Sequence, residues 1–221
     1  EDYKRLEYEM HLLHNEYTGG LKLGASTTIA QYVLPPLLAS FIGKFPQVSL
    51  SLLNGNSREI EAALQEHRID LGFVEGVFRL PNIRYTTFLE DELVAVVRTG
   101  SKLAVGEEIT PDELFHLPLV LRERGSGTLD VFERALQQHN IKLSSLQVLM
   151  YLGSTESIKL FLEHTDCLGI VSVRSITREL YSGQLRVVEI KGMPMLRDFS
   201  FAQPQGQESG LAQVFMQFAM H

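Results

Sequence analysis

The sequence has few of the residues on which disulfide and metal chemistry depend. Its single cysteine, Cys167, can form neither an internal disulfide bond nor a cysteine-based zinc site, and we expect it to be a core residue. The seven histidines are scattered, and none belongs to a His-Glu-x-x-His motif. His11 and His14 have helical i,i+3 spacing, but no third ligand stands near them. We therefore expect no metal site and no cofactor.

The motifs of common enzyme classes are missing as well. Gly125-Ser126-Gly127 lacks the spacing of a Gly-x-Ser-x-Gly elbow, and no Gly-x-Gly-x-x-Gly follows the first predicted strand. A Gly-Lys-Ser or Gly-Lys-Thr phosphate loop is also absent. The acidic run Glu90-Asp91-Glu92 precedes a β-type stretch, and we interpret it as a solvated turn. These absences predict a protein that is not an enzyme.

Long apolar runs and an excess of positive charge are lacking too. No stretch approaches the roughly 18 consecutive apolar residues that cross a bilayer. Residues 1–5 are not the basic flank of a secretory signal. We therefore expect a cytoplasmic protein with no membrane partner. The net charge of −7 and the absence of tryptophan argue against phosphate neutralisation and base stacking, so direct DNA binding by these residues is not expected.

What the sequence does contain is an alternating pattern of short β-branched runs and longer segments of helical period. With 221 residues, of which 44% are hydrophobic, it can form one large domain or two small ones. The alternation predicts an α/β fold with a largely parallel sheet. We predict strands at 21–25, 48–53, 71–74, 93–98, 119–121, 147–151, 169–173 and 185–189, a short turn at 27–33, and helices at 36–45, 57–67, 127–139, 155–164, 174–182 and 209–219.

Residues 1–17 contain neither glycine nor proline and repeat apolar residues at spacings of three and four. That heptad pattern predicts a helix that packs a narrow stripe against a partner helix. The alternative is an amphipathic helix lying on its own domain. Gly19-Gly20 is expected to end it. The seam residues are Tyr3, Leu6, Met10, Leu13 and Tyr17.

Three small polar clusters each follow a predicted strand and precede a predicted helix. The carboxyl ends of parallel strands form the crevice in which ligands bind, and helix N-termini supply free amides and partial positive charge. Together they predict a cleft for a small anion, although ordinary N-capping uses the same residue types. The clusters are Ser26, Thr27 and Thr28; Gly125, Ser126, Gly127 and Thr128; and Gly153, Ser154 and Thr155.

Two arginines stand directly before the second cluster. A guanidinium at Arg122 or Arg124 can hold a carboxylate, phosphate or sulfur oxyanion through two parallel hydrogen bonds. Either one can equally be a surface residue paired with Glu123. The sequence does not decide between these interpretations.

Several short motifs, taken in order, resemble the effector-binding domain of LysR-type transcription regulators. They are LKLGAST at 21–27, LPPLL at 34–38, IDLGF at 69–73 and GIV at 169–171. Each motif is degenerate alone, but their order and spacing are specific, and the resemblance covers essentially the whole chain. One departure is Arg174, which stands where the family commonly has proline or serine.

The resemblance implies two lobes shaped like those of type 2 periplasmic binding proteins. Lobe one would comprise 20–97 and 197–221, and lobe two 98–196, with crossovers near 98–102 and 193–197. Residues 1–19 would be the end of the linker helix through which such regulators dimerise. The winged helix-turn-helix that precedes this helix in the family is not among these 221 residues.

The resemblance also implies a function. A small anionic metabolite would bind between the lobes, at Ser26, Thr27, Thr28, Arg122 and the two later clusters. Closure would then repack a homodimer or homotetramer, re-space its DNA-binding domains and change contact with RNA polymerase. The alternatives are a substrate-binding component of a transport system and an enzyme on the same fold, which would need an acid, base or metal set that the sequence does not show.

Overall fold

The computed structural model describes residues 17–104, 106–206 and 210–220. The predicted helix at 1–17 therefore lies outside the described residues except for Tyr17, which lies two residues before the first strand and is not helical. The strands are β1 (Gly19–Ser26), β2 (Val48–Gly55), β3 (Leu71–Glu75), β4 (Ile83–Arg98), β5 (Glu108–Ile109), β6 (Pro118–Arg122), β7 (Gln147–Leu152), β8 (Leu168–Ser172), β9 (Leu185–Ile190) and β10 (Met195–Pro204). The helices are α2 (Thr27–Tyr32), α3 (Leu34–Lys44), α4 (Ser57–Gln65), α5 (Gly127–Gln138), α6 (Thr155–His164), α7 (Thr177–Tyr181) and α8 (Gly210–Ala219), with 3-10 turns η1 (Pro111–His116), η2 (Leu143–Ser145) and η3 (Val173–Ser175).

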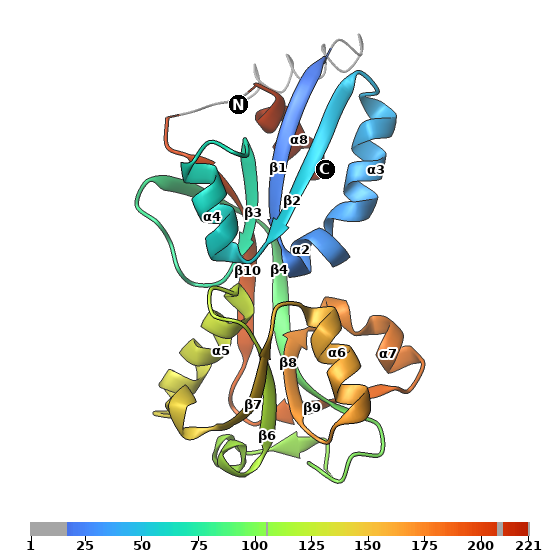
Figure 1. Cartoon of the computed structure of the whole chain (residues 1–221), viewed down its shortest axis with the longest axis vertical. Coiled ribbons are helices and arrows are strands. Elements are labelled where there is room, and N and C mark those ends of the chain that lie inside the picture. The colour runs from blue at the N-terminus through green and yellow to red at the C-terminus, as the bar shows by residue number, and fades with distance from the viewer. Residues whose placement is uncertain (1–16, 105, 207–209, 221) are drawn as a thin grey trace.

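Two lobes are stacked along the long axis of the molecule, and the long strands β4 and β10 run between them (Figure 1). The strands form one sheet in the order β2-β1-β3-β10-β4-β8-β6-β7, and β9 pairs with β4 and β5 off this path. Within the lobes, β1 is parallel to β2 and β3, and β6 is parallel to β7 and β8. The predicted α/β class with two lobes of mostly parallel sheet is confirmed.

In the first lobe, alternate residues of β3 bury opposite faces of the sheet. Phe73 packs in a cluster with residues of α3 and α8, whereas Val74 packs with Ile60 and Leu64 of α4. The N-terminus of α4 is fixed by a capping box in which the Asn56 side chain accepts from the backbone of Glu59 and the Glu59 carboxylate accepts from the backbone of Asn56.

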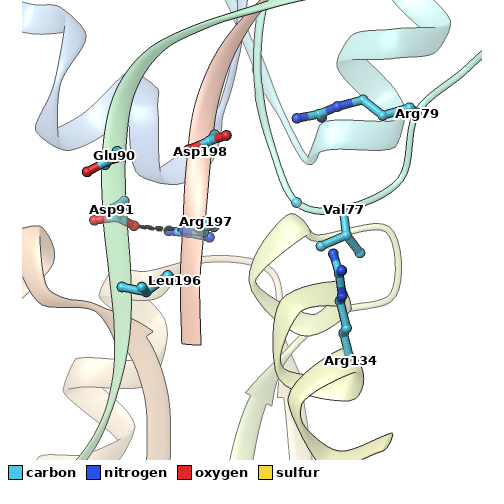
Figure 2. A pocket seen from close by; sticks show the side chains of 9 residues that line it. Val77, Arg79, Glu90, Asp91, Arg134, Leu196, Arg197 and Asp198 are labelled. Atoms are coloured by element: carbon cyan, nitrogen blue, oxygen red, sulfur yellow. Dashed lines mark hydrogen bonds and ion pairs between the residues drawn. The ribbon is translucent and has the colours of Figure 1, made fainter. Parts of the chain in front are cut away.

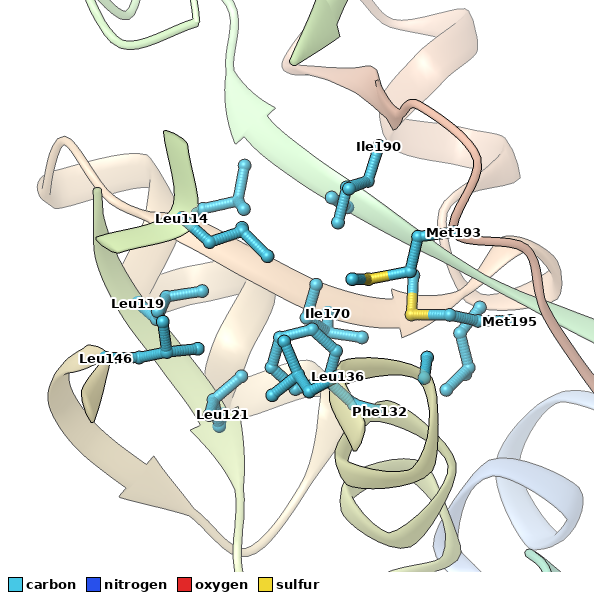
Figure 3. Close-up of a cluster of buried hydrophobic side chains, with 14 of the residues drawn as sticks. Leu114, Leu119, Leu121, Phe132, Leu136, Leu146, Ile170, Ile190, Met193 and Met195 are labelled. Carbon is cyan, nitrogen blue, oxygen red and sulfur yellow. The ribbon is translucent and has the colours of Figure 1, made fainter. Parts of the chain in front are cut away.

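The second lobe repeats this layering. Leu119 and Leu121 of β6 pack against α5, and Val120 between them packs against α6 on the other face. Figure 3 shows the α5 side, where Phe132 and Leu136 lie among Leu119, Leu121 and Ile170. Because β6 is apolar on both faces, it is covered on both sides, as buried parallel strands are.

The crossing strands differ most from the sequence predictions. Of β4 we predicted only residues 93–98, and we predicted no strand at β10. The missed segments mix charged and apolar residues, because they pass from the core of one lobe to the core of the other. Leu93, Ala95 and Val97, placed with lobe one by the expected boundary, pack instead in the core of lobe two. The first crossing therefore lies between Leu89, which packs in lobe one, and Leu93.

Three smaller predictions need correction. Glu90-Asp91-Glu92 is not a turn but part of β4, and Asp91 is buried. Within the segment 27–33, residues 27–32 form the helix α2 rather than a turn. The helix predicted at 174–182 is divided into η3 and α7, with Ile176 between them.

Candidate functional site at the junction of the lobes

The Arg122 side chain connects two of the three polar clusters and both lobes. Its Nη2 donates to Thr27 Oγ1 of the first lobe (3.3 Å) and to the Gly153 carbonyl of the second (3.4 Å). Its Nε and Nη2 also donate to the Glu123 carboxylate at 2.8 and 3.1 Å. Arg122 is only 1% exposed, whereas Arg124 is exposed, so the structure distinguishes the two arginines that the sequence left equivalent.

The first cluster begins α2 at the end of β1, and its hydroxyls are not used for helix capping. Ser26 occupies the N-cap position, but its side chain makes no capping hydrogen bond. Thr27 Oγ1 donates instead to the carbonyl of Gly55 (3.1 Å), and Thr28 Oγ1 donates to Glu75 (3.3 Å). N-capping therefore does not explain these buried hydroxyls.

In each of the other two clusters, one serine side chain forms an N-capping hydrogen bond. Ser126 Oγ accepts from the Thr128 amide (3.2 Å), and Ser154 Oγ accepts from the Ser157 amide (3.1 Å). These bonds fix the N-termini of α5 and α6 next to the junction. Thr155, the first residue of α6, is buried there.

The glycines of the second cluster permit close approach of the two lobes. A Cβ on Gly127 would lie 2.3 Å from the Glu75 carbonyl oxygen, far inside van der Waals contact. Gly125 has φ 93°, which side-chain-bearing residues rarely adopt, and its carbonyl accepts from the Arg58 amide (3.3 Å). The start of α5 thus rests directly on the ends of β3 and α4.

A second buried arginine, Arg197 of β10, joins the first and second clusters. Its Nη1 donates to Thr128 Oγ1 (3.0 Å) and lies 3.3 Å from the Glu75 carboxylate, which Thr28 also contacts. Its Nε donates to Asp91 Oδ2 (2.7 Å). All three charged side chains are at most 1% exposed. Sequence reasoning missed Arg197, because its partners are distant along the chain.

Asp91 also receives a hydrogen bond and an ion pair from the second lobe. Ser172 Oγ at the end of β8 donates to Asp91 Oδ1 (2.7 Å), and Arg174 Nε lies 3.4 Å from the same oxygen. Arg174, the departure from the family pattern, thus contributes to this network. The two positive charges of Arg174 and Arg197 balance the two negative charges of Asp91 and Glu75 at the crossing strands.

On the α2 and α6 side, a separate contact holds the lobes together. The Tyr32 hydroxyl of α2 donates to the Glu156 carboxylate of α6, and Lys159 lies 5.4 Å from the Tyr32 ring centroid and 2.8 Å from Glu156. Burial and the neighbouring Glu156 raise the pKa of Tyr32, so its hydroxyl stays protonated as a donor. Burial raises the pKa of Glu156, but hydrogen bonds from Lys159 and Tyr32 outweigh it and lower that pKa.

Four buried polar atoms at the junction have no hydrogen-bond partner within the described residues: Ser26 Oγ, Arg122 Nη1, Glu75 Oε2 and Arg197 Nη2, the last of which still lies 2.7 Å from Asp91 Oδ2 as an ion pair. Ser26 Oγ and Arg122 Nη1 can each donate a hydrogen bond, and Arg122 Nη1 belongs to a cationic guanidinium, whereas Glu75 Oε2 is an acceptor on a carboxylate. In the described part of the chain, no group of three or more His, Cys, Asp or Glu residues is arranged to hold a metal ion. Nor is any described helix long and apolar enough to span a membrane.

Comparison with known proteins relates this chain to transcription regulators. A family model described as the LysR substrate binding domain matches residues 14–221. The HTH-type transcriptional regulator YeiE of Escherichia coli (strain K12) is 35% identical over 182 residues, which are 82% of this chain and 61% of that protein. The RuBisCO operon transcriptional regulator of Acidithiobacillus ferrooxidans is 29% identical, covering 97% of this chain and 69% of its own length. The chain thus spans about three fifths of the length of the first of these relatives.

Two solved structures share the fold. The regulatory domain of CcmR from Synechocystis PCC6803, in complex with 2-PG, superposes with a TM-score of 0.82 and 28% identity, covering 92% of this chain and 96% of that one. The effector binding domain of QuiR, in complex with shikimate, has a TM-score of 0.81 at 19% identity, covering 92% and 96%, and this likeness is one of fold alone.

Proposed function

Because the chain belongs to the LysR substrate-binding domain family, we propose that it is the sensing domain of a transcription regulator and that a small anionic metabolite binds between its lobes. The observation that carries the proposal is the pair of buried donors without partners, Ser26 Oγ and Arg122 Nη1. A buried donor without a partner costs free energy, which an oxyanion bound to both atoms would recover.

The other predicted contacts would complete the site. Thr27, Thr28 and Thr155 supply hydroxyls, while Gly125, Ser126, Gly127 and Thr128 form the N-terminal turn of α5, and Gly153 and Ser154 lead into α6. Two relatives of the same fold are described in complex with small metabolites, 2-PG and shikimate, which supports a ligand of similar size. The proposed role is binding without catalysis.

The proposed mechanism is a shift between lobe arrangements. Arg122 contacts both lobes, so a ligand that binds Arg122 and Ser26 favours the closed arrangement over one in which these residues are apart. In the whole regulator, closure would change the packing of a homodimer or homotetramer and re-space its DNA-binding domains, altering contact with RNA polymerase. Such a regulator would act in the cytoplasm. Family membership favours this function over a transport component.

The test is a thermal-shift screen of the protein against sulfate, phosphate, small carboxylates, phosphorylated acids and 2-PG. A ligand present at one hundred times its dissociation constant adds about 2.7 kcal/mol of stability. Ser26→Ala should abolish the stabilisation, whereas the control Ser49→Ala, at an exposed serine of β2, should retain it. Stabilisation that survives Ser26→Ala, or no stabilisation by any anion, would reject the site.

A further inference from the structure

A separate cavity of about 400 Å³ opens beside the crossing strands, between β10, the β3–β4 loop and α5 (Figure 2). Its volume lies in the range typical of small-molecule sites. The buried Arg197–Asp91 pair contributes to its wall, and the same Arg197 contacts Thr128 at the junction described above. The cavity therefore adjoins the proposed anion site but is lined largely by other residues.

Two arginines lie on one side of the cavity. Arg79 of the β3–β4 loop is held in place, because its guanidinium stacks 4.5 Å from the Tyr85 ring centroid and Nη2 donates to Ser200 Oγ (3.3 Å). Arg134 of α5 has no ion pair or hydrogen bond with any described residue. In Figure 2 the Arg79 side chain extends toward β10 and that of Arg134 toward Val77. One arginine comes from each lobe.

The crossing strands supply carboxylates to the same cavity. Glu90 of β4 and Asp198 of β10 are directly opposite each other in the antiparallel ladder, and both are exposed. Like charges in such a pair repel. The Asp198 carboxylate accepts one hydrogen bond, from Thr87 (3.3 Å), and the Glu90 carboxylate has no partner within the described residues. A cation bound near them would relieve the repulsion.

We propose that this cavity binds a small zwitterion of the α-amino acid class. Its carboxylate would lie at Arg79 and Arg134, and its ammonium group at Asp198 and Glu90. A ligand with one charge would leave one of these pairs uncompensated, so both charges are required. Because the lining comes from both lobes and from the strands that join them, the occupant would favour one lobe arrangement independently of the anion at the junction.

The experiment measures binding of the common L-α-amino acids by thermal shift and calorimetry, beside their N-acetyl and amide derivatives, which each lack one charge. At least one free amino acid should bind, with its two derivatives weaker by about tenfold or more. Arg134→Gln and Asp198→Asn, at exposed side chains, should each cause a similar loss. Arg68→Gln, an exposed arginine paired with Glu66 far from the cavity, should leave binding unchanged.

The junction variant Ser26→Ala separates this proposal from the previous one. Amino acid binding that persists in Ser26→Ala but is lost in Arg134→Gln assigns the ligand to the cavity. Binding lost in Ser26→Ala and retained in both cavity variants would place the ligand at the junction and overturn the proposal. A panel without any binding amino acid, or derivatives that bind as well as the free acids, would overturn it too.

Discussion

The charged side chain of Arg197 is fully buried, and its contribution to stability depends on its partners. Breaking a buried ion pair by removing one charge leaves the other uncompensated, at a cost of about 3–5 kcal/mol. Arg197→Met would remove the positive charge that pairs with both Asp91 and Glu75. We therefore expect a loss of about this size in the free energy of unfolding, measured by urea denaturation. Arg68→Met, at an exposed pair, should cost less than about 1 kcal/mol, and equal losses in the two variants would contradict this account.

Glu61 on α4 offers a test by pH. Its carboxyl is buried and accepts a hydrogen bond from Tyr85 (2.6 Å), and burial raises its pKa above the usual 4.5. As pH rises from 4.5 to the raised pKa, the unfolded chain loses this proton before the folded protein does, so Glu61 makes the protein progressively less stable. Above the folded-state pKa the penalty is complete.

Glu61→Gln removes this titration and retains an oxygen that accepts from Tyr85. The stability of this variant relative to the unmodified protein should therefore increase as pH rises above 4.5 and level off above the raised pKa. Glu163→Gln, at an exposed glutamate of α6, should show no such increase. Urea denaturation at a series of pH values measures both, and a flat difference for Glu61→Gln would disprove the buried-charge penalty.

At the scale of elements, the start of α5 determines how closely the lobes approach. Gly127→Ala places a methyl group against the Glu75 carbonyl of the first lobe, whereas Gly153→Ala, before α6, meets nothing within 4 Å. We expect Gly127→Ala to cost about 1–3 kcal/mol, as overpacking does, and to push the lobes apart. Calorimetry and the radius of gyration from small-angle X-ray scattering measure these effects. A Gly127→Ala protein as compact and stable as Gly153→Ala would refute the close contact.

The elements that the sequence predicted well are those in which packing against other elements produces a recognisable local pattern of apolar and polar residues. Strands buried on both faces, such as β6 and β8, are continuous apolar runs, and α4, α5 and α6 have helical periodicity with a polar residue at the N-cap. β10 and the first half of β4 show no such pattern, because these strands pass from the core of one lobe to the core of the other. Asp91 looked solvated for the same reason: its partner Arg197 lies 106 residues away in the sequence.

The same distinction applies to the candidate site. Strand ends and helix starts placed Ser26, Thr28 and Thr155 at the junction from sequence alone, since the topology of a parallel sheet brings these positions together. The sequence could not tell that Arg122 is buried and Arg124 exposed, because both precede the same glycine turn. Nor could it find Arg197, whose role depends on pairing between strands.

At the scale of the whole molecule, β4 and β10 cross between the lobes in the part of the chain that the structure describes, and polar contacts lie on either side of them. On one side α5 rests on Glu75 and α4, and on the other Tyr32 contacts Glu156. A ligand that bridges the lobes and binds one arrangement better than another would shift the population towards that arrangement. Each lobe retains its own buried apolar core while the arrangement of the lobes changes.

The two edges of the sheet suggest how the domain meets a second copy. Among the described strands, β2 ends the sheet in lobe one and β7 ends it in lobe two, and both edges, with the adjoining α3 and α6, carry exposed apolar side chains. These are Ile42, Leu52, Leu53, Leu149, Met150, Tyr151 and Leu160. Open strand edges with apolar flanks are rarely left uncovered. We expect a two-fold dimer in which the β7–α6 edge of each copy packs on the β2–α3 edge of the other, as an isologous interface allows.

Leu160→Glu tests this dimer, because Leu160 is 57% exposed on α6 and its replacement should not disturb the core. A charge on each α6 would have to be buried at both symmetry-related contacts, so the dimer should dissociate at least about tenfold more readily. Phe78→Glu is the matched control, since Phe78 is 50% exposed on the β3–β4 loop, away from both edges. Sedimentation velocity over a range of concentrations should show a monomer for the first variant and a dimer for the second. If Phe78→Glu dissociates the protein and Leu160→Glu does not, the copies meet through the face that carries the charged cavity instead.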